Sequence, residues 1–299
     1  MDMLSVTGLY KRFGDKEVLR GLDLSVPRHS VFGFVGKNGS GKTTTMKTVL
    51  GLLKADAGEI VVNGEKVVYG QTATNRHIGY LPDVPEFYSF MTAREYLRFC
   101  GEISELDARE SNKRASELLE LVGLSGETHR IKGFSRGMKQ RLGIAQALLN
   151  CPKLLVCDEP TSALDPVGRK EILDLLLAVR EQTTVLFSTH ILSDVERICT
   201  DVAFLNNGVS EMAGKLSDIK AKYRREEYLI ETETEGGCGL LKTAFPKMQK
   251  TGANGLRFLE HDYAPADVLR FLADRRVALL KLERVEPTLE SLFMEVTEK

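Results

Sequence analysis

The clearest hydrophobic pattern in the chain is a continuous apolar run at Val31–Val35 (VFGFV), which is typical of a strand buried on both faces. A glycine-rich turn follows it, and a helix is then predicted from about Gly41. Apolar residues recur along this helix at helical spacing, which places them on one face. They are Met46, Val49, Leu50 and Leu53. The pattern therefore predicts a strand, a loop and a helix in succession.

The segments around this unit carry two further patterns. Residues 4–26 alternate like short strands separated by turns, which predicts an N-terminal antiparallel β subdomain. The stretch of about 84–150 is almost purely helical in pattern, and Thr92 and Glu95 have the spacing of a capping box at a helix start. We therefore expect a helical insertion within an otherwise mixed domain.

Strand and helix patterns alternate again after the insertion. Apolar runs at 154–157 (LLVC) and 185–188 (VLFS) have the length of buried strands, and a helix is predicted to open between them at Pro166. Such alternation is typical of a mostly parallel sheet with helices on its faces.

The length of 299 residues favours two domains, because single cores seldom grow beyond about 250–300 residues. We place the first at 1–222 and an accessory α+β domain at 223–299. The second has the pattern strand, helix, strands, helix, strand, beginning near Tyr228, and a last helix is predicted to open at Pro287.

Composition and charge exclude several classes of protein. Hydrophobic residues make up 42% and charged residues 28% of the chain, as in ordinary globular proteins. With 41 Lys and Arg against 42 Asp and Glu and no basic block, nucleic acid is not expected as a partner. The N-terminus lacks the layout of a signal peptide, and no apolar run approaches the roughly 20 residues of a membrane span. Any membrane role must therefore come from another subunit.

The strongest chemical motif is GKNGSGKT, which follows the predicted strand and opens the predicted helix. Its backbone N–H groups and the positive helix end suit phosphate oxygens, while Lys42 would reach the β- and γ-phosphates. Thr43 would hold Mg²⁺ and Thr44 would assist at the α-phosphate. The residues predicted to bind the nucleotide here are Gly36, Lys37, Asn38, Gly39, Ser40, Gly41, Lys42, Thr43 and Thr44. The fold expected is thus a P-loop NTPase core with the β subdomain, the helical insertion and the C-terminal α+β domain.

A second motif places two acids at the end of a strand. Asp158 and Glu159 directly follow the run at 154–157, and side chains at the carboxyl edge of a parallel sheet meet the nucleotide crevice. One acid can then bind the metal shell and the other can act on water. An Asp-Glu pair at a strand end is, taken alone, more often a turn or a helix-start charge. The phosphate loop earlier in the chain makes the functional interpretation the better one.

Together these residues resemble the nucleotide-binding subunits of ABC transporters over roughly residues 1–215. The resemblance implies that Phe13 stacks on adenine and that His190, after the second strand, is the switch histidine. It also identifies 134–142 (FSRGMKQRL) as the signature segment and SALD, which ends at Asp165, as the D-loop beside the nucleotide. Lys42, Glu159 and His190 would be the catalytic residues.

The signature segment has both a structural and a functional interpretation. Ser135 can cap the following helix, and Gly137 leaves backbone open to a phosphate. The resemblance implies that this helix end touches ATP held by a second copy or a homologous cassette, in a head-to-tail dimer.

The chain departs from the common family pattern at three positions. Arg136 and Met138 stand where Gly and Gln are frequent, and Asp83 replaces the usual Q-loop glutamine. A carboxylate at that position could bind Mg²⁺ through water but cannot donate an amide hydrogen bond. The metal ligands predicted are therefore Thr43, Asp158 and Asp83.

The family resemblance also predicts the working assembly. ATP and Mg²⁺ would bind, two cassettes would close, and Glu159 would polarise the attacking water. The tail at 285–299 resembles exporter cassettes that pair with a separate integral membrane permease, so the chain is expected on the cytoplasmic face of the membrane. The alternative is a soluble ABC-type ATPase that remodels a macromolecular complex.

Overall fold

The computed structural model of the chain describes residues 2–71, 73–223, 226–286 and 288–297, which divide into two compact units. The first unit comprises the described residues up to Leu216 together with 296–297, and the second runs from Ser217 to Glu295. The boundary expected from the sequence, after residue 222, lies at the end of helix α7 (Leu216–Lys222). No helix among the described residues is long and apolar enough to span a bilayer.

The N-terminal residues form an antiparallel sheet with the strand order β2-β1-β4-β5. The prediction of several short strands was wrong here, because residues 2–27 form one long hairpin of two 12-residue strands. Its pairing register shifts at four places, and these irregularities interrupt the alternation that the sequence shows. The strands are β1 (Asp2–Phe13), β2 (Lys16–Pro27), β4 (Ala57–Val62) and β5 (Glu65–Lys66).

A second sheet holds the centre of the first unit, with the order β10-β9-β3-β8-β7-β6. Every neighbouring pair is parallel except β9 and β10, so the predicted mostly parallel sheet is confirmed. Its strands are β3 (Val31–Val35), β6 (Ile78–Leu81), β7 (Leu154–Asp158), β8 (Thr184–Thr189), β9 (Asp201–Asn206) and β10 (Val209–Lys215).

Successive residues of β3 show how the layers pack. Phe32 and Phe34 are at most 1% exposed and point into a core shared with the antiparallel sheet and helix α1 (Lys42–Val49). Gly33 lies on the other face, where a Cβ would be 3.0 Å from a methyl of Val195. Val195 belongs to α6 (Leu192–Ile198), and the helix before it is α5 (Pro166–Val179), which opens at Pro166 as predicted.

Helix α1 is shorter than the apolar stripe implied. It begins after Gly41 as predicted but ends at Val49, so Leu50 is its C-cap and Leu53 lies outside it. Gly51 adopts the left-handed conformation with φ of 68°, and Leu53 N–H donates to the Lys47 carbonyl instead of continuing the helix. The prediction that Leu53 belongs to the helix was therefore wrong.

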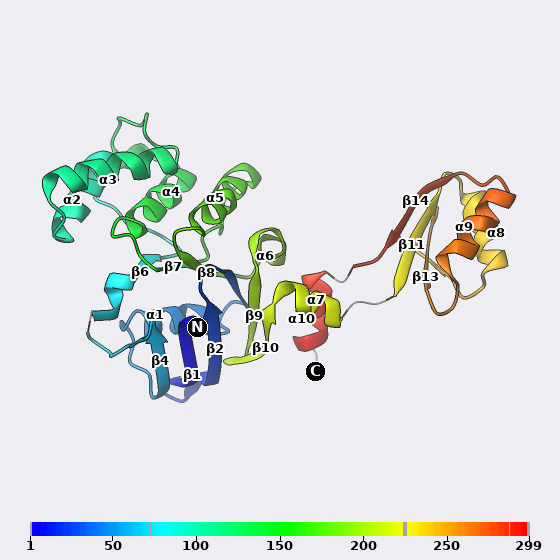
Figure 1. Ribbon diagram of the computed structural model, residues 1–299, viewed down its shortest axis with the longest axis horizontal. Coiled ribbons are helices and arrows are strands. Elements are labelled where there is room, and N and C mark those ends of the chain that lie inside the picture. The colour runs from blue at the N-terminus through cyan, green and yellow to red at the C-terminus, as the bar shows by residue number, and fades with distance from the viewer. Residues whose placement is uncertain (1, 72, 224–225, 287, 298–299) are drawn as a thin grey trace. The chain divides into compact units, whose positions relative to one another are not determined.

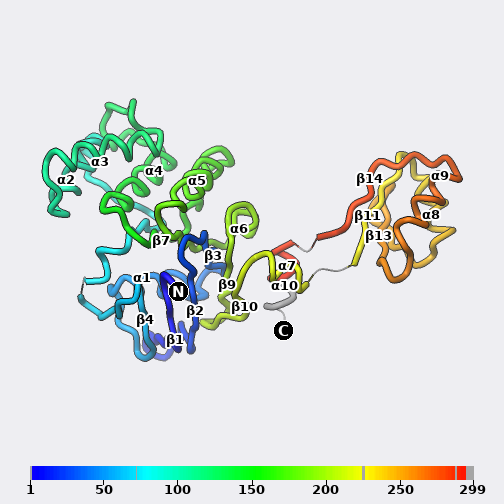
Figure 2. The backbone as a smooth tube through the Cα atoms, in the orientation of Figure 1, coloured from blue at the N-terminus to red at the C-terminus, as the bar shows by residue number. Residues whose placement is uncertain are grey.

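The segment between β6 and β7 leaves the sheet, forms a helical subdomain and returns, a path that the tube in Figure 2 follows. It holds α2 (Ala93–Ile103), α3 (Ala108–Leu121) and α4 (Arg136–Ala147). Figure 1 shows α2 and α3 at the end of this unit away from β1 and β4. Thr92 and Glu95 make the predicted capping box, with Thr92 N–H donating to Glu95 Oε2 at 2.8 Å. Short 3₁₀ turns occur at Ala73–His77 and Ile131–Gly133.

Two glycines bring α4 against the edge strand β6. A Cβ on Gly79 would lie 2.1 Å from the Ala147 carbonyl oxygen, and one on Gly143 would lie 2.5 Å from Leu81 Cδ1. Such distances are far inside van der Waals contact, so a side chain at Gly79 would collide with backbone and one at Gly143 would have to displace the Leu81 side chain. The C-terminal half of α4 is thus packed directly on the sheet.

The second unit is a four-stranded antiparallel sheet in the order β12-β13-β11-β14, with α8 and α9 packed on it through a separate core. The predicted succession of strands and helices is confirmed, although the predicted helix start at Pro287 lies outside the described residues. The elements are β11 (Glu227–Thr232), α8 (Glu235–Ala244), β12 (Gln249–Lys250), β13 (Gly255–Leu259), α9 (Pro265–Asp274) and β14 (Leu279–Arg284). Helix α10 (Leu289–Thr297) follows, and its last two residues are grouped with the first unit.

Candidate functional site

The glycine-rich motif forms the connection from β3 to α1, as its mechanism requires. Gly39 and Gly41 have φ values of 82° and 113°, which are strained for any other residue, and Gly41 is the N-cap of α1. No side chain caps this helix end, so its backbone N–H groups remain directed at a cavity of about 440 Å³. The cavity is lined by Lys16, Val18, Asn38, Gly39, Gly41, Lys42, Thr43, Thr44, Asp83, Asp158 and Glu159.

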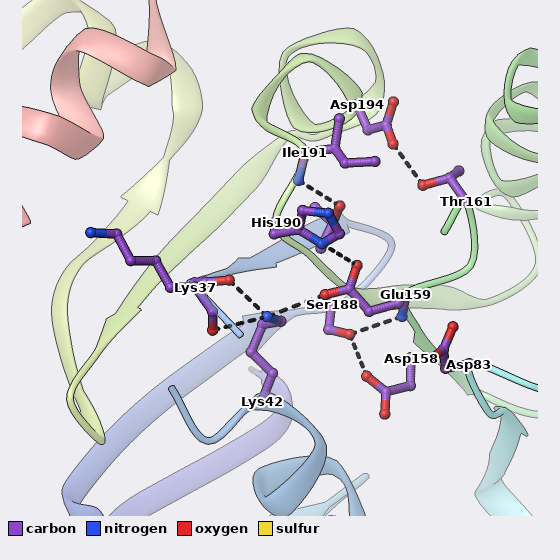
Figure 3. Close-up of polar contacts among 12 residues, drawn as sticks. Lys37, Lys42, Asp83, Asp158, Glu159, Thr161, Ser188, His190, Ile191 and Asp194 are labelled. Atoms are coloured by element: carbon purple, nitrogen blue, oxygen red, sulfur yellow. Dashed lines mark hydrogen bonds and ion pairs between the residues drawn. The ribbon is translucent and has the colours of Figure 1, made fainter. Parts of the chain in front are cut away.

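Lys42 holds the centre of the site together. Its Nζ donates to the Gly36 carbonyl at 2.7 Å and lies 3.2 Å from Glu159 Oε1, while the side chain is only 5% exposed (Figure 3). Ser40 is also buried, and its Oγ has no hydrogen-bond partner. The ammonium group is therefore anchored at the phosphate loop yet borders the cavity, where it can meet an anion.

The two acids after β7 are positioned by a serine of β8. Ser188 lies beside Asp158 in the parallel register; its Oγ donates to Asp158 Oδ1 at 2.6 Å and accepts from Glu159 N–H at 3.0 Å. Burial here also raises the pKa of the Cys157 thiol, with the Asp158 carboxylate adding to the effect. Sequence reasoning missed Ser188, although the end of the VLFS strand pattern carries it.

Glu159 connects this strand end with the next one. Its φ of 48° is left-handed, an uncommon conformation for a non-glycine residue that turns the chain immediately after β7. The carboxylate reaches Lys42 through Oε1 and accepts a contact from His190 Nδ1 through Oε2 at 2.9 Å. His190 follows β8 and is 45% exposed, so the predicted switch histidine and the predicted base are direct neighbours (Figure 3).

Asp83 follows β6 and lines the same cavity. Its carbonyl accepts from the buried Gln140 Nε2 at 2.9 Å, and its carboxylate Oδ1 lies 3.7 Å from Arg136 Nη2 at the first turn of α4. Two positions that depart from the family pattern, Asp83 and Arg136, are therefore paired with each other. Sequence reasoning treated them separately.

The remaining predicted residues do not line this cavity, as far as the described residues show. Ser135 caps α4, accepting from Met138 N–H at 3.2 Å, and a Cβ on Gly137 would meet nothing closer than 4.0 Å. Asp165 caps α5, accepting from Gly168 N–H at 3.1 Å. Phe13 is 50% exposed at the end of β1, with Lys11 Nζ 5.3 Å from the ring centre. These residues carry the expected local geometry and open surface, and the roles implied for them at a nucleotide remain predictions.

The oxygen donors around the cavity fit magnesium bound together with phosphate. Thr43, Asp83 and Asp158 supply a hydroxyl and two carboxylates, and Asp83 Oδ1 is buried without a hydrogen-bond partner. No group of three or more His, Cys, Asp or Glu side chains in the described residues is arranged to hold a metal alone. In Mg²⁺ sites built on one or two carboxylates, water and substrate phosphates complete the shell.

The strand, phosphate loop and helix, with two acids at the end of a neighbouring parallel strand, define a P-loop nucleotide-binding protein. A family model described as "ABC transporter" matches residues 19–162, and one described as "ATP-binding protein DrrA1-3-like, C-terminal domain" matches 214–297. The chain belongs to the ABC transporter ATP-binding proteins, which confirms the resemblance seen in the sequence.

Relatives and a solved structure agree with this assignment. An uncharacterised ABC transporter ATP-binding protein of Bacillus subtilis is 36% identical, over 98% of this chain and 99% of its own length. The bacitracin transport ATP-binding protein of Bacillus licheniformis is 33% identical, over 98% of this chain and 97% of its own. A structure described as the ATP binding subunit of an ABC transporter shares 32% identity and a TM-score of 0.65, covering 74% of this chain and 93% of that one.

Proposed function

We propose that the chain hydrolyses ATP and thereby drives export through a separate membrane permease. The observation that carries the hydrolytic part is the position of Glu159, whose two carboxylate oxygens contact Lys42 and His190 at 3.2 and 2.9 Å. The Glu159 carboxylate, which lines the cavity, thus lies between a cation suited to phosphate and the His190 imidazole. That is the geometry expected of a group that orients water beside a γ-phosphate.

The roles of the other residues follow from their positions. Lys42 and the N–H groups at the start of α1 would bind the phosphates. Thr43, Asp158 and, through water, Asp83 would hold Mg²⁺, which supplies positive charge to the phosphates when bound. Glu159 would accept a hydrogen bond from the attacking water, and His190 would hold the carboxylate and the water in place.

A second copy or a homologous cassette completes the proposed machine. The backbone around Ser135 and Gly137 is open, and it begins the 12-residue helix α4, so its N–H groups suit a phosphate from outside this chain. Head-to-tail pairing would place this turn on the partner's ATP, with Asp165 beside it. ATP would then favour the closed pair, because only that pair makes these contacts.

The membrane partner is supported by an apolar surface after β6. Val84, Tyr88 and Phe90 are 62%, 51% and 61% exposed, and Tyr88 packs on Phe90 and on Phe99 with ring centres 5.9 and 5.5 Å apart. Exposed aromatic clusters of this kind are typical of interfaces. The segment carrying them follows Asp83 directly, so we propose that the permease docks here, on the cytoplasmic face of the membrane, and responds to the nucleotide site. The similarity to the bacitracin transport protein supports a transport role, and export is the direction we propose.

The decisive experiment compares the full chain with Glu159→Gln. The variant should bind ATP, shift toward dimer on a sizing column with ATP, and lose most hydrolysis, typically by about 100-fold or more. Glu181→Gln, at an 81% exposed side chain, is the matched control and should hydrolyse like wild type. Hydrolysis by Glu159→Gln at the wild-type rate would contradict the assignment.

A separate experiment tests the membrane partner. The full chain, purified from detergent-solubilised membranes, should bring down a polytopic membrane protein, and Tyr88→Ser with Phe90→Ser should release it. Recovery of a ribosomal or DNA complex instead would support the alternative of a remodelling ATPase.

A further inference from the structure

A buried polar cluster lies next to the catalytic contacts without touching the cavity. Asp194 on α6 is 1% exposed, and both of its carboxylate oxygens are engaged. Thr161 Oγ1 donates to Oδ2 at 2.7 Å, and Arg169 Nε from α5 donates to Oδ1 at 2.5 Å. Arg169 Nη2 also donates to Ser193 Oγ at 2.7 Å. Burying a carboxylate destabilises the folded chain unless its oxygens are hydrogen-bonded, as both are here.

The cluster ties together the two loops that carry the catalytic side chains. Thr161 stands two residues after Glu159, and Asp194 stands four residues after His190. The loop after β7 therefore meets the segment after β8 through two side-chain pairs, Glu159 with His190 and Thr161 with Asp194 at the start of α6, as Figure 3 shows. In the first pair the His190 side chain is 45% exposed, whereas Thr161 and Asp194 of the second pair are both buried.

The loop after β7 needs such an anchor because its backbone is strained. Glu159 and Ala163 have left-handed φ values of 48° and 52°, and Thr161 lies between them. Conformations of this kind persist only where surrounding contacts fix them. The Thr161 hydroxyl is the side chain within this strained stretch that is bonded to a buried acid.

We infer that Asp194 is a positioning residue for hydrolysis. Through its bond to Thr161 it fixes the loop that orients the Glu159 carboxylate. The same bond holds this loop in a fixed position relative to the segment that carries His190. This inference rests on the proposed ATPase function. It assigns Asp194 no contact with nucleotide, metal or water. Its loss should therefore lower kcat while leaving ATP binding nearly unchanged, because Lys42 and the phosphate loop are held by other bonds.

The test compares Thr161→Val, Thr161→Ser and Asp194→Asn in the full chain. Thr161→Val keeps the shape but removes the hydroxyl, and Thr161→Ser keeps the hydroxyl. We expect kcat to fall about 10- to 100-fold in Thr161→Val and Asp194→Asn, with the KM for ATP within about twofold, and to recover in Thr161→Ser. The double variant Thr161→Val with Asp194→Asn should be no slower than the worse single variant, because the two groups act as one unit.

A second link between the same helices provides the control. Asp174 on α5 pairs with Arg197 on α6 at 2.8 Å, but both side chains are at least 40% exposed and neither is in the catalytic loops. Asp174→Asn should leave kcat unchanged. If Asp194→Asn does not fold, the comparison of kcat between Thr161→Val and Thr161→Ser tests the positioning role.

The outcomes separate this inference from the proposed function. A wild-type chain that does not hydrolyse ATP overturns the function itself. Wild-type hydrolysis with an unchanged kcat in Thr161→Val, or an equal loss in Thr161→Ser and Thr161→Val, overturns the positioning role while leaving the ATPase assignment intact. A fall in unfolding temperature without a fall in kcat likewise shows a merely structural cluster.

Discussion

Lys42 and Glu159 form an ion pair, with Nζ 3.2 Å from Oε1 and side chains only 5% and 13% exposed. The charge of Lys42, which is suited to bind phosphate, and the charge of Glu159, which is suited to orient water, thus neutralise each other. A bound γ-phosphate would compete with Glu159 for the same ammonium group. The pair would therefore link nucleotide binding to the freedom of the carboxylate that we propose is catalytic.

Removal of Lys42 should weaken both binding and folding. In Lys42→Met the affinity for ATP should fall about 10- to 100-fold, because a charge-assisted hydrogen bond is worth about 1.5–3 kcal/mol. Glu159 would also lose a buried partner, lowering the free energy of unfolding by about 1–3 kcal/mol. Calorimetry and urea unfolding measure the two effects.

The matching variants separate charge from shape. Lys42→Met with Glu159→Gln should recover part of the lost stability, since no unpaired acid remains. Lys47→Met, at an exposed side chain of α1 outside the predicted nucleotide-binding residues, should change neither quantity strongly. An equal loss of stability in the single and double variants would contradict the pairing.

Asp83→Asn should raise the Mg²⁺ concentration needed for half-maximal hydrolysis. A neutral amide oxygen is a weaker partner for Mg²⁺ and its water than a carboxylate. The free energy of unfolding should change by less than about 1 kcal/mol, since the Arg136 pair is 3.7 Å long and about half exposed on both sides. Magnesium titrations of activity and of ATP binding provide the measurement, with Asp274→Asn in the second unit as control. An unchanged magnesium requirement would remove Asp83 from the metal ligands.

Tyr80 on β6 should make the free energy of unfolding decrease as the pH rises in the alkaline range. Burial raises the pKa of its hydroxyl to about 12, and the Asp158 charge adds to the shift. The neutral phenol is thus favoured in the folded chain, so this contribution is complete below the unfolded value near 10 and is lost as pH rises toward 12. Tyr80→Phe should lose less stability between pH 9 and 11 than wild type in urea unfolding. Parallel pH profiles of the two chains would rule out this contribution.

The second unit should unfold without loss of nucleotide binding. Leu241 is fully buried in its core, and Leu241→Ala should cost about 2–5 kcal/mol of that unit's stability. Its neighbour Leu240 is 47% exposed, so Leu240→Ala is a control with the same chemistry. Differential scanning calorimetry should show a lower transition for Leu241→Ala only, while ATP affinity stays constant. A parallel loss of ATP affinity would show that the two cores are not independent.

Local features that depend on residues close together in the sequence were predictable. The phosphate loop follows from GKNGSGKT between an apolar run and a helical stripe, and the capping box follows from Thr92 and Glu95. The end of α1 was missed because an apolar residue at the right spacing, Leu53, outweighed the glycine at position 51 that stops the helix.

Contacts between distant strands were not predictable in the same way. Ser188 meets Asp158 only through the register of two parallel strands, and Thr161 meets Asp194 only once α5 and α6 are packed. The Asp83–Arg136 pair likewise requires α4 to lie against the end of β6. Pattern and spacing reveal which residues share an element, whereas these relationships depend on the order of strands in the sheet.

The glycines that press α4 onto β6 have a mechanical consequence. With Gly79 against the Ala147 carbonyl and Gly143 against Leu81, there is no slack between this helix and the strand end that carries Asp83. Helix α4 thus connects its N-cap, Ser135, to the edge of the sheet through direct packing. We expect a displacement of this N-cap, on the surface proposed to meet a second cassette, to reach the end of β6 that precedes Asp83 through these contacts.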